Sequence, residues 1–111
     1  VYMMNQPAPG AVGKVYQVRI WESMPGRSQQ TLKTAMGAKS IHEKLGASVG
    51  VNVDQFGRLH YVTSFDSWEA LGKFQSAAQA SKEWKDYSSQ FSANPSAELV
   101  KFYMASQVPA D

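Results

Sequence analysis

The strongest constraint on this chain is the order in which two hydrophobic periodicities follow one another. Apolar and polar side chains alternate in four short segments, 15–21, 48–54, 58–65 and 98–105, and this period of two is typical of β-strands. Apolar residues spaced by three and four run through 28–45 and 66–94, which indicates helices. The sequence therefore predicts the order βαββαβ, in which the second helical region is either one kinked helix or two consecutive helices.

This order predicts an α+β domain of the ferredoxin-like class, in which a four-stranded antiparallel sheet carries the helices on one face. The chain of 111 residues fits a single domain, which we place at residues 14–111. Two prolines and two glycines within residues 1–13 predict an irregular N-terminal arm. That arm lacks the basic start and the apolar stretch of a signal peptide, so we expect a cytoplasmic protein.

Composition argues against several classes of function. The chain has no cysteine, which excludes disulfides, thiolate nucleophiles and cysteine-ligated metals. A formal net charge of +2 is too small for the basic footprint of a nucleic-acid binder, and no apolar run approaches the ~18 residues of a membrane-spanning helix. The two histidines lie far apart in the sequence. We therefore expect no metal, no cofactor, no nucleic acid and no membrane partner.

The alternation within the strands predicts which side chains face the helices. In the first strand we expect the more apolar set, Tyr16, Val18 and Ile20, to face the helices. The opposite sheet face then carries a mixture of rings, apolar residues and polar groups that is too apolar to remain exposed to water. We expect a second copy of the chain to cover this face. The predicted interface residues are Arg19, Trp21, Asn52, His60, Val62 and Tyr103.

The segment Tyr61–Leu71, with the sequence YVTSFDSWEAL, follows a strand–helix–hairpin arrangement and precedes a long helical region and a final strand. Over roughly residues 14–105 this arrangement resembles the dimeric α/β-barrel superfamily. Members pair two ferredoxin-like sheets face to face and include cofactor-independent monooxygenases, haem-degrading enzymes and lactone isomerases. The resemblance implies a homodimer and a ligand between helices and sheet, and it implies little about the reaction.

Aromatic residues at helical spacing in the second helical region, together with tyrosines of the sheet, indicate either a plain core or an apolar pocket. His42 borders the same region near the end of the first helix, where it is either a histidine favoured by the helix dipole or a group that faces a ligand. His42 and Tyr61 are weak candidates for a catalytic role. The predicted ligand-binding residues are Tyr16, His42, Tyr61, Phe65, Phe74 and Trp84.

These observations favour a protein that binds an apolar small molecule in an aromatic-lined pocket. One alternative is a cofactor-independent monooxygenase that acts on an aromatic or other apolar substrate, with a histidine or tyrosine accepting its proton. Another is a non-catalytic dimeric interaction module. Haem degradation is less favoured, because the haem-degrading relatives carry an iron-binding histidine in the second helical region and residues 67–91 contain none.

An RNA-recognition domain is the main rival from another class, since it shares the order βαββαβ and stacks bases on aromatic residues of the sheet. Tyr16 and Tyr61 occupy roughly those positions in the sequence. We expect both tyrosines to face the helices instead, because the reverse orientation would bury Gln17, Arg19 and His60 in the core.

Overall fold

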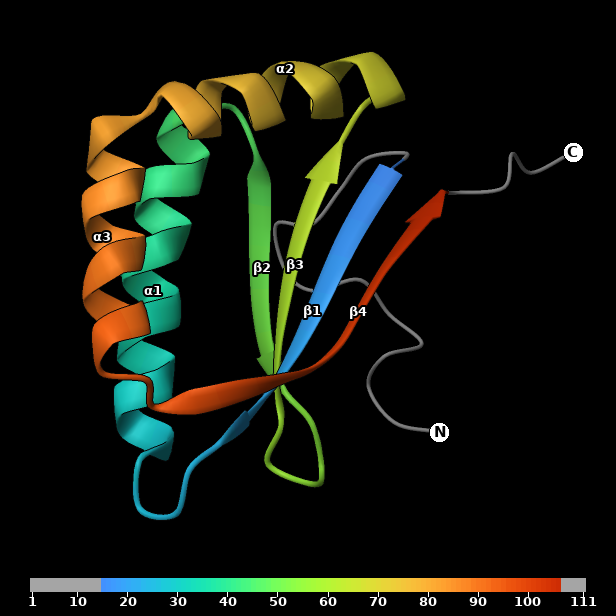
Figure 1. The fold of residues 1–111 in the computed structure, drawn as a ribbon. Helices are drawn as coiled ribbons and strands as arrows, with labels where there is room; N and C mark the ends of the chain where they lie inside the picture. The colour runs from blue at the N-terminus through green and yellow to red at the C-terminus, as the bar shows by residue number, and fades with distance from the viewer. Residues whose placement is uncertain (1–14, 107–111) are drawn as a thin grey trace, which may run out of the picture.

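The computed structural model describes residues 15–106, and the predicted arm at 1–13 lies outside them. It contains four strands and three helices, in the order β1 (Val15–Ser23), α1 (Ser28–Lys44), β2 (Ser48–Val53), β3 (Leu59–Phe65), α2 (Trp68–Ala80), α3 (Lys82–Ala93) and β4 (Ala97–Ser106). The strands form one antiparallel sheet in the order β2-β3-β1-β4. The predicted α+β class with a four-stranded antiparallel sheet is confirmed. In Figure 1, α1 and α3 lie side by side next to the sheet, and α2 crosses its upper end.

The second helical region is two helices that are separated at Ser81. The backbone of Ser81 is extended, with φ −78° and ψ 114°, so the helical path stops there. Its hydroxyl oxygen accepts a hydrogen bond from the backbone N–H of Trp84 at 3.1 Å and caps the start of α3. The break allows α3 to turn away from α2 and run along α1 (Figure 1).

The sheet has two apolar surfaces, which we call the helix side and the reverse face. The helix side buries Val49 of β2, Leu59 and Phe65 of β3, and Leu71 and Phe74 of α2 in one cluster. The reverse face holds a separate cluster of Val18, Ile20 and Val62, with Tyr16 and Tyr103 packed against it.

The predicted orientation of β1 is wrong. Residues directly opposite each other in antiparallel strands lie on the same side of a sheet, and Arg19 is opposite Tyr61 whereas Val18 is opposite Val62. Arg19 and Trp21 therefore lie on the helix side, and Tyr16, Val18 and Ile20 lie on the reverse face. Both sides of β1 carry apolar residues, so hydrophobicity alone did not fix which side turns toward the helices.

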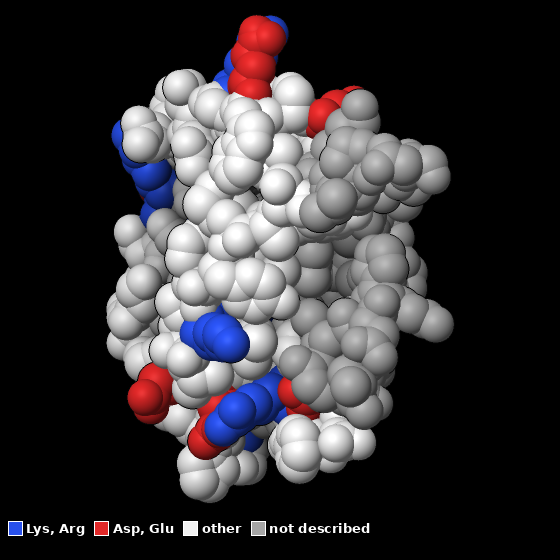
Figure 2. Space-filling view, turned by 90° about the vertical axis from the view of Figure 1, so that its right-hand side faces the viewer, with Lys and Arg blue, Asp and Glu red and all other residues white. Residues whose placement is uncertain are grey.

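β2, β3 and the second half of β4 face as predicted, whereas a β-bulge in β4 places Leu99, and not Val100, opposite Trp21. Of the predicted interface residues, those on the reverse face are Asn52, His60, Val62 and Tyr103. No helix among residues 15–106 packs over this surface. The described part of the side viewed in Figure 2 shows few charged side chains in its middle, and the charged residues gather mainly toward the ends and one edge.

His60 makes a buried hydrogen bond with Asp54 at the end of the β2–β3 hairpin. Its Nε2 donates to the Asp54 carboxylate at 2.7 Å, and the two side chains are 2% and 8% exposed. The other carboxylate oxygen of Asp54 accepts from the backbone N–H groups of Phe56 at 2.8 Å and Arg58 at 3.1 Å. Burial alone would raise the pKa of Asp54, but these hydrogen bonds outweigh it and lower the pKa. The pair therefore fixes the hairpin turn to the reverse face.

No helix within residues 15–106 has the length and apolar character needed to span a membrane.

Candidate functional site

A cavity of about 640 Å³ lies between the helices and the helix side of the sheet. It is bordered by β1 and β3 below, by α1, α2 and α3 above, and by the start of β4. Its aromatic lining residues are Trp21, Tyr61, Phe74, Trp84 and Phe91. Its polar and charged lining residues are Gln17, Arg19, Thr31, Thr34, His42, Thr63, Gln75, Gln79, Ser92 and Ser96. The volume falls within the ~300–1,000 Å³ that is typical of small-molecule sites.

A hydrogen-bonded pair, His42 of α1 and Tyr61 of β3, forms one wall of this cavity. His42 Nδ1 and the Tyr61 hydroxyl oxygen lie 2.6 Å apart, and the two residues are 8% and 5% exposed. The imidazole is enclosed by aromatic rings, with the Trp84 centroid at 4.1 Å and the edge-on Phe74 centroid at 5.4 Å. The imidazole is therefore held in a single place by one hydrogen bond and by rings on its sides.

The surroundings favour the uncharged form of both partners. Burial, and secondly the positive charge of Arg19, lower the pKa of His42 from 6.5 to about 4. Burial raises the pKa of Tyr61 well above its ordinary value of 10.0. The Tyr61 hydroxyl has no other acceptor among the described residues, so we infer that it donates to Nδ1 and that the imidazole proton resides on Nε2. That N–H has no hydrogen-bond acceptor within residues 15–106.

Arg19 lies opposite Tyr61 on β1 and is the one charged residue among the described residues that line the cavity. Its guanidinium carbon lies 4.7 Å from the centroid of the Phe102 ring on β4, a cation–π contact. Burial lowers its pKa, although the side chain remains protonated at neutral pH because a guanidinium does not deprotonate in proteins. The structure assigns it no hydrogen bond or ion pair with any residue between 15 and 106.

Further polar contacts close the cavity at other points. The Thr63 hydroxyl donates to Gln17 Oε1 at 3.3 Å across β1 and β3. At the start of β4, the buried Thr31 hydroxyl of α1 lies 3.2 Å from the backbone oxygen of Ser96 and 3.0 Å from the Ser96 hydroxyl oxygen. The side-chain oxygen of Gln17 and these hydroxyls are thus used within the protein.

α3 covers the cavity but contains no fully buried residue. It is attached to α1 by Tyr87, whose hydroxyl donates to the backbone oxygen of Thr34 at 2.8 Å. The Tyr87 ring lies over Gly37, where an added Cβ would come within 2.8 Å of the ring atom Cζ and closer still to the hydroxyl oxygen. A glycine at position 37 is therefore what permits α3 to approach α1 at this point.

The structure brings most of the predicted pocket residues together. His42, Tyr61, Phe74 and Trp84 line one cavity. Phe65 does not line it, because it is buried behind Phe74 with the two ring centroids 5.1 Å apart. The placement of Tyr16 in the pocket is wrong, since β1 turns this ring to the reverse face.

Arg19, Gln17 and Trp21 were not predicted as pocket residues. They were assigned to the opposite face because Tyr16, Val18 and Ile20 looked like the more hydrophobic side of the strand. The available signal in the sequence is that Val15 and Trp21, at the two ends of the same side of the strand, are both apolar. On this side of β1, apolar residues at the two ends flank the polar Gln17 and Arg19, and these two polar residues face the cavity.

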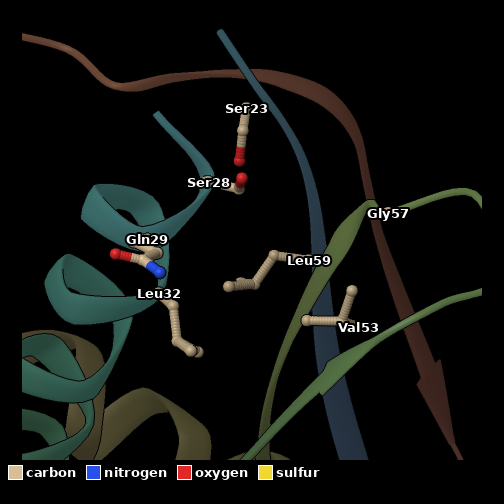
Figure 3. Close-up of a pocket in the computed structure, with 7 residues that line it drawn as sticks. All are labelled: Ser23, Ser28, Gln29, Leu32, Val53, Gly57 and Leu59. Atoms are coloured by element: carbon tan, nitrogen blue, oxygen red, sulfur yellow. The ribbon is translucent and has the colours of Figure 1, made fainter. Parts of the chain in front are cut away.

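A second, smaller cavity of about 180 Å³ lies near the start of α1. Figure 3 shows its lining, in which Leu32 of α1, Leu59 of β3 and Val53 of β2 converge from opposite sides. No charged residue lines it within the described part of the chain. It offers apolar contact and no arrangement of groups for chemistry.

The described residues contain no cluster of three or more histidine or acidic side chains that would hold a metal ion.

The argument against RNA recognition was based partly on β1, and that part is wrong, because Tyr16 lies on the reverse face. The second stacking position, Tyr61, is buried on the helix side. The residues that β3 presents on the reverse face are His60, Val62 and Ser64, none of which offers a large aromatic ring for stacking.

Neither a scan of protein-family models nor a search of curated proteins finds a match to this chain.

Proposed function

We propose that this protein binds an apolar organic molecule, aromatic or long-chain, in the cavity between the helices and the helix side of the sheet. The observation that carries the proposal is the cavity itself, about 640 Å³ in volume and lined by five aromatic residues together with polar groups. The cavity is partly open to solvent, so a small molecule can reach its interior. A space of this size among rings is therefore suited to a ligand.

Binding of N-phenyl-1-naphthylamine, an uncharged fluorescent probe, tests this proposal. Ala78 lines the cavity on α2, whereas Ala80 on the same helix is exposed and does not line it. We expect the natural protein to bind the probe saturably at one site per chain. Ala78→Phe should weaken binding at least about tenfold, because the added ring fills the cavity, while Ala80→Phe should not.

Circular dichroism on both variants verifies that they are folded. Absence of saturable binding by the natural protein, or equal loss in the two variants, would contradict the proposal. In that case the third possibility from the sequence, a non-catalytic interaction module, would be favoured.

The properties of His42 favour ligand binding over oxygenase chemistry as the function of the cavity. The direct contact between His42 and Tyr61 at 2.6 Å is the observation that supports proton transfer in the cavity. An imidazole with a pKa of about 4 is, however, a weak base. Removing a proton from a phenol of pKa near 10 would be uphill by about 8 kcal/mol. If the protein nevertheless consumes oxygen with phenolic or quinol substrates, and His42→Gln abolishes that activity, oxygenase chemistry takes precedence over simple binding.

We further propose that the reverse face and its outer strand pair with a second copy of the chain. Two observations support this. The reverse face carries the apolar cluster of Val18, Ile20 and Val62. β4 is a 10-residue edge strand with Val100 and Phe102 41% and 45% exposed, and a long apolar edge of this kind promotes association unless it is paired.

Sedimentation equilibrium tests the dimer. We expect a mass twice the 12.2 kDa of one chain at micromolar concentration. Tyr103→Glu on the reverse face should shift the mass toward that of the monomer. Phe56→Glu, a similar change at a residue that is 74% exposed in the hairpin turn, should not. A monomeric natural protein would refute the dimer and leave the ligand proposal untouched.

A further inference from the structure

We propose that the ligand of the cavity is an organic anion, an aromatic or otherwise apolar carboxylate, whose acid group binds the guanidinium of Arg19. This inference rests on the proposed ligand-binding function and specifies the chemical class of the ligand. It depends on the position of Arg19, on how its side chain is held, and on the absence of a counter-charge nearby.

Arg19 is held in a way that leaves its donors available. Its guanidinium lies over the Phe102 ring with the central carbon 4.7 Å from the ring centroid, a cation–π contact that uses no hydrogen bond. The five N–H donors of a guanidinium lie in its plane and point outward from its edge. Arg19 makes no hydrogen bond or ion pair with any residue between 15 and 106, so none of these residues occupies the fork that matches a carboxylate.

The cavity offers no negative charge to Arg19. None of the described residues lining it is an aspartate or a glutamate. Glu43, the acidic residue that influences the neighbouring Tyr61, is engaged by Lys39 at 2.6 Å on the outside of α1. A partly buried cation without a counter-charge is unfavourable, and an anionic ligand would relieve that cost.

The other groups in the cavity suit the remainder of such a molecule. Trp84 and Phe74 provide apolar surface around the imidazole of His42. The Nε2 proton of that imidazole, which has no acceptor among residues 15–106, is a second donor that an oxygen atom of the ligand would satisfy. The cavity thus combines the unpaired cation of Arg19, the unused Nε2 donor of His42 and several rings, and it lacks any described acidic side chain.

Three matched naphthalene probes test the sign of the ligand charge. They are 2-naphthoate, the uncharged 2-naphthamide and the cationic 2-naphthylmethylamine, measured by isothermal titration calorimetry at pH 7. We expect the natural protein to bind the carboxylate about 10- to 100-fold more tightly than the amide, because a hydrogen bond to a charged partner is worth about that factor. The amine should bind most weakly, since it would place a second cation beside Arg19.

Arg19→Gln should remove the preference, lowering carboxylate affinity about 10- to 100-fold and amide affinity less than about threefold. The control is Arg58→Gln, which makes the same change of charge at an exposed arginine paired with Glu22 at 3.0 Å outside the cavity. It should leave the preference intact.

The outcomes separate the two proposals. If neither these probes nor N-phenyl-1-naphthylamine binds, the proposed function fails and this inference fails with it; if N-phenyl-1-naphthylamine binds and none of the three does, only the ligand class is wrong. If the amide or the amine binds as tightly as the carboxylate, or if both arginine variants have equal effects, the ligand class is wrong and the cavity remains a binding site. Should Arg19→Gln not fold, the comparison of the three probes on the natural protein still decides the sign of the charge.

Discussion

Lowering the pH should destabilise this protein through His42 in a way that can be separated from all other titrations. The imidazole is buried between α1 and the sheet, and its pKa in the folded chain is about 4 against 6.5 when it is freely hydrated. The groups that face it are the cation Arg19 from β1, the hydroxyl of Tyr61 from β3, and the uncharged rings of Phe74 and Trp84. Burial, and secondly the charge of Arg19, disfavour a charged imidazole more than the rings and the hydroxyl favour it.

The sign and size of the effect follow from the two pKa values. Between pH 6.5 and 4 the unfolded chain binds a proton at His42 that the folded chain does not, so the free energy of unfolding falls as the pH is lowered. His42 lowers the free energy of unfolding by an amount near zero at pH 7, about 1.4 kcal/mol at pH 5.5 and about 3 kcal/mol at pH 4. Below pH 4 both states bind the proton and the loss is complete. Against a typical stability of about 5–15 kcal/mol, this is a large fraction.

Urea unfolding, followed by circular dichroism at several pH values between 4 and 7.5, provides the measurement. The comparison protein is the double variant His42→Phe/Tyr61→Phe, which removes the titrating group together with the hydroxyl that would otherwise lose its acceptor. Replacing both partners of a buried hydrogen bond by apolar groups of similar shape costs far less than removing one. The pair of His60 and Asp54 is present in both proteins, so its contribution cancels in the difference.

We expect the natural protein to lose about 3 kcal/mol more than the double variant between pH 7 and pH 4. If both proteins lose the same stability, His42 is not held in its neutral form, and the account of the hydrogen-bonded pair is refuted. A smaller loss in the natural protein would mean that the folded state stabilises the charged imidazole, which reverses the argument.

The remaining predictions concern how the helices are attached. Gly72→Ala should stabilise the protein by about 0.5–1 kcal/mol, because an added Cβ there meets no atom within 4 Å and alanine favours the helix. Gly37→Ala should instead destabilise it by about 1–3 kcal/mol, because the methyl group would collide with Tyr87; thermal unfolding of both variants checks this, and the same sign for both would contradict it. Thr31→Val should cost about 1–2 kcal/mol in urea unfolding by removing the buried hydroxyl that contacts Ser96, whereas Thr31→Ser should lose less than half of that.

Much of the fold could be predicted because each segment has one dominant period. The helix-facing residues of β3, which include Leu59, Tyr61 and Phe65, are bulkier and more apolar than the alternate residues that face the other way. The alternation along the strand therefore predicts its two sides correctly. β1 lacks that asymmetry. Its two sides carry Tyr16, Val18 and Ile20 against Val15, Gln17, Arg19 and Trp21, and a pattern with apolar residues on both sides has no preferred orientation until its neighbours are in place.

The site was predicted to the extent that it depends on helices and on β3. His42 and Trp84 were found from helical spacing, and Tyr61 from the alternation within its strand. Arg19 was missed because a charged residue in a strand is ordinarily assigned to the side away from the core. It occupies the helix side because a cavity, and not close-packed core, lies above it.

The uneven attachment of the three helices has a consequence for how such a protein would diversify. All polar groups proposed to recognise a ligand belong to α1 and to two inner strands, which are anchored by buried residues. α3, which has no buried residue, supplies rings and a covering surface. Recognition and access are therefore assigned to separate parts of the chain. Under the proposed function, substitutions along α3 other than at Trp84, whose ring packs against His42, would change the size and shape of the molecules admitted and leave Arg19 in place.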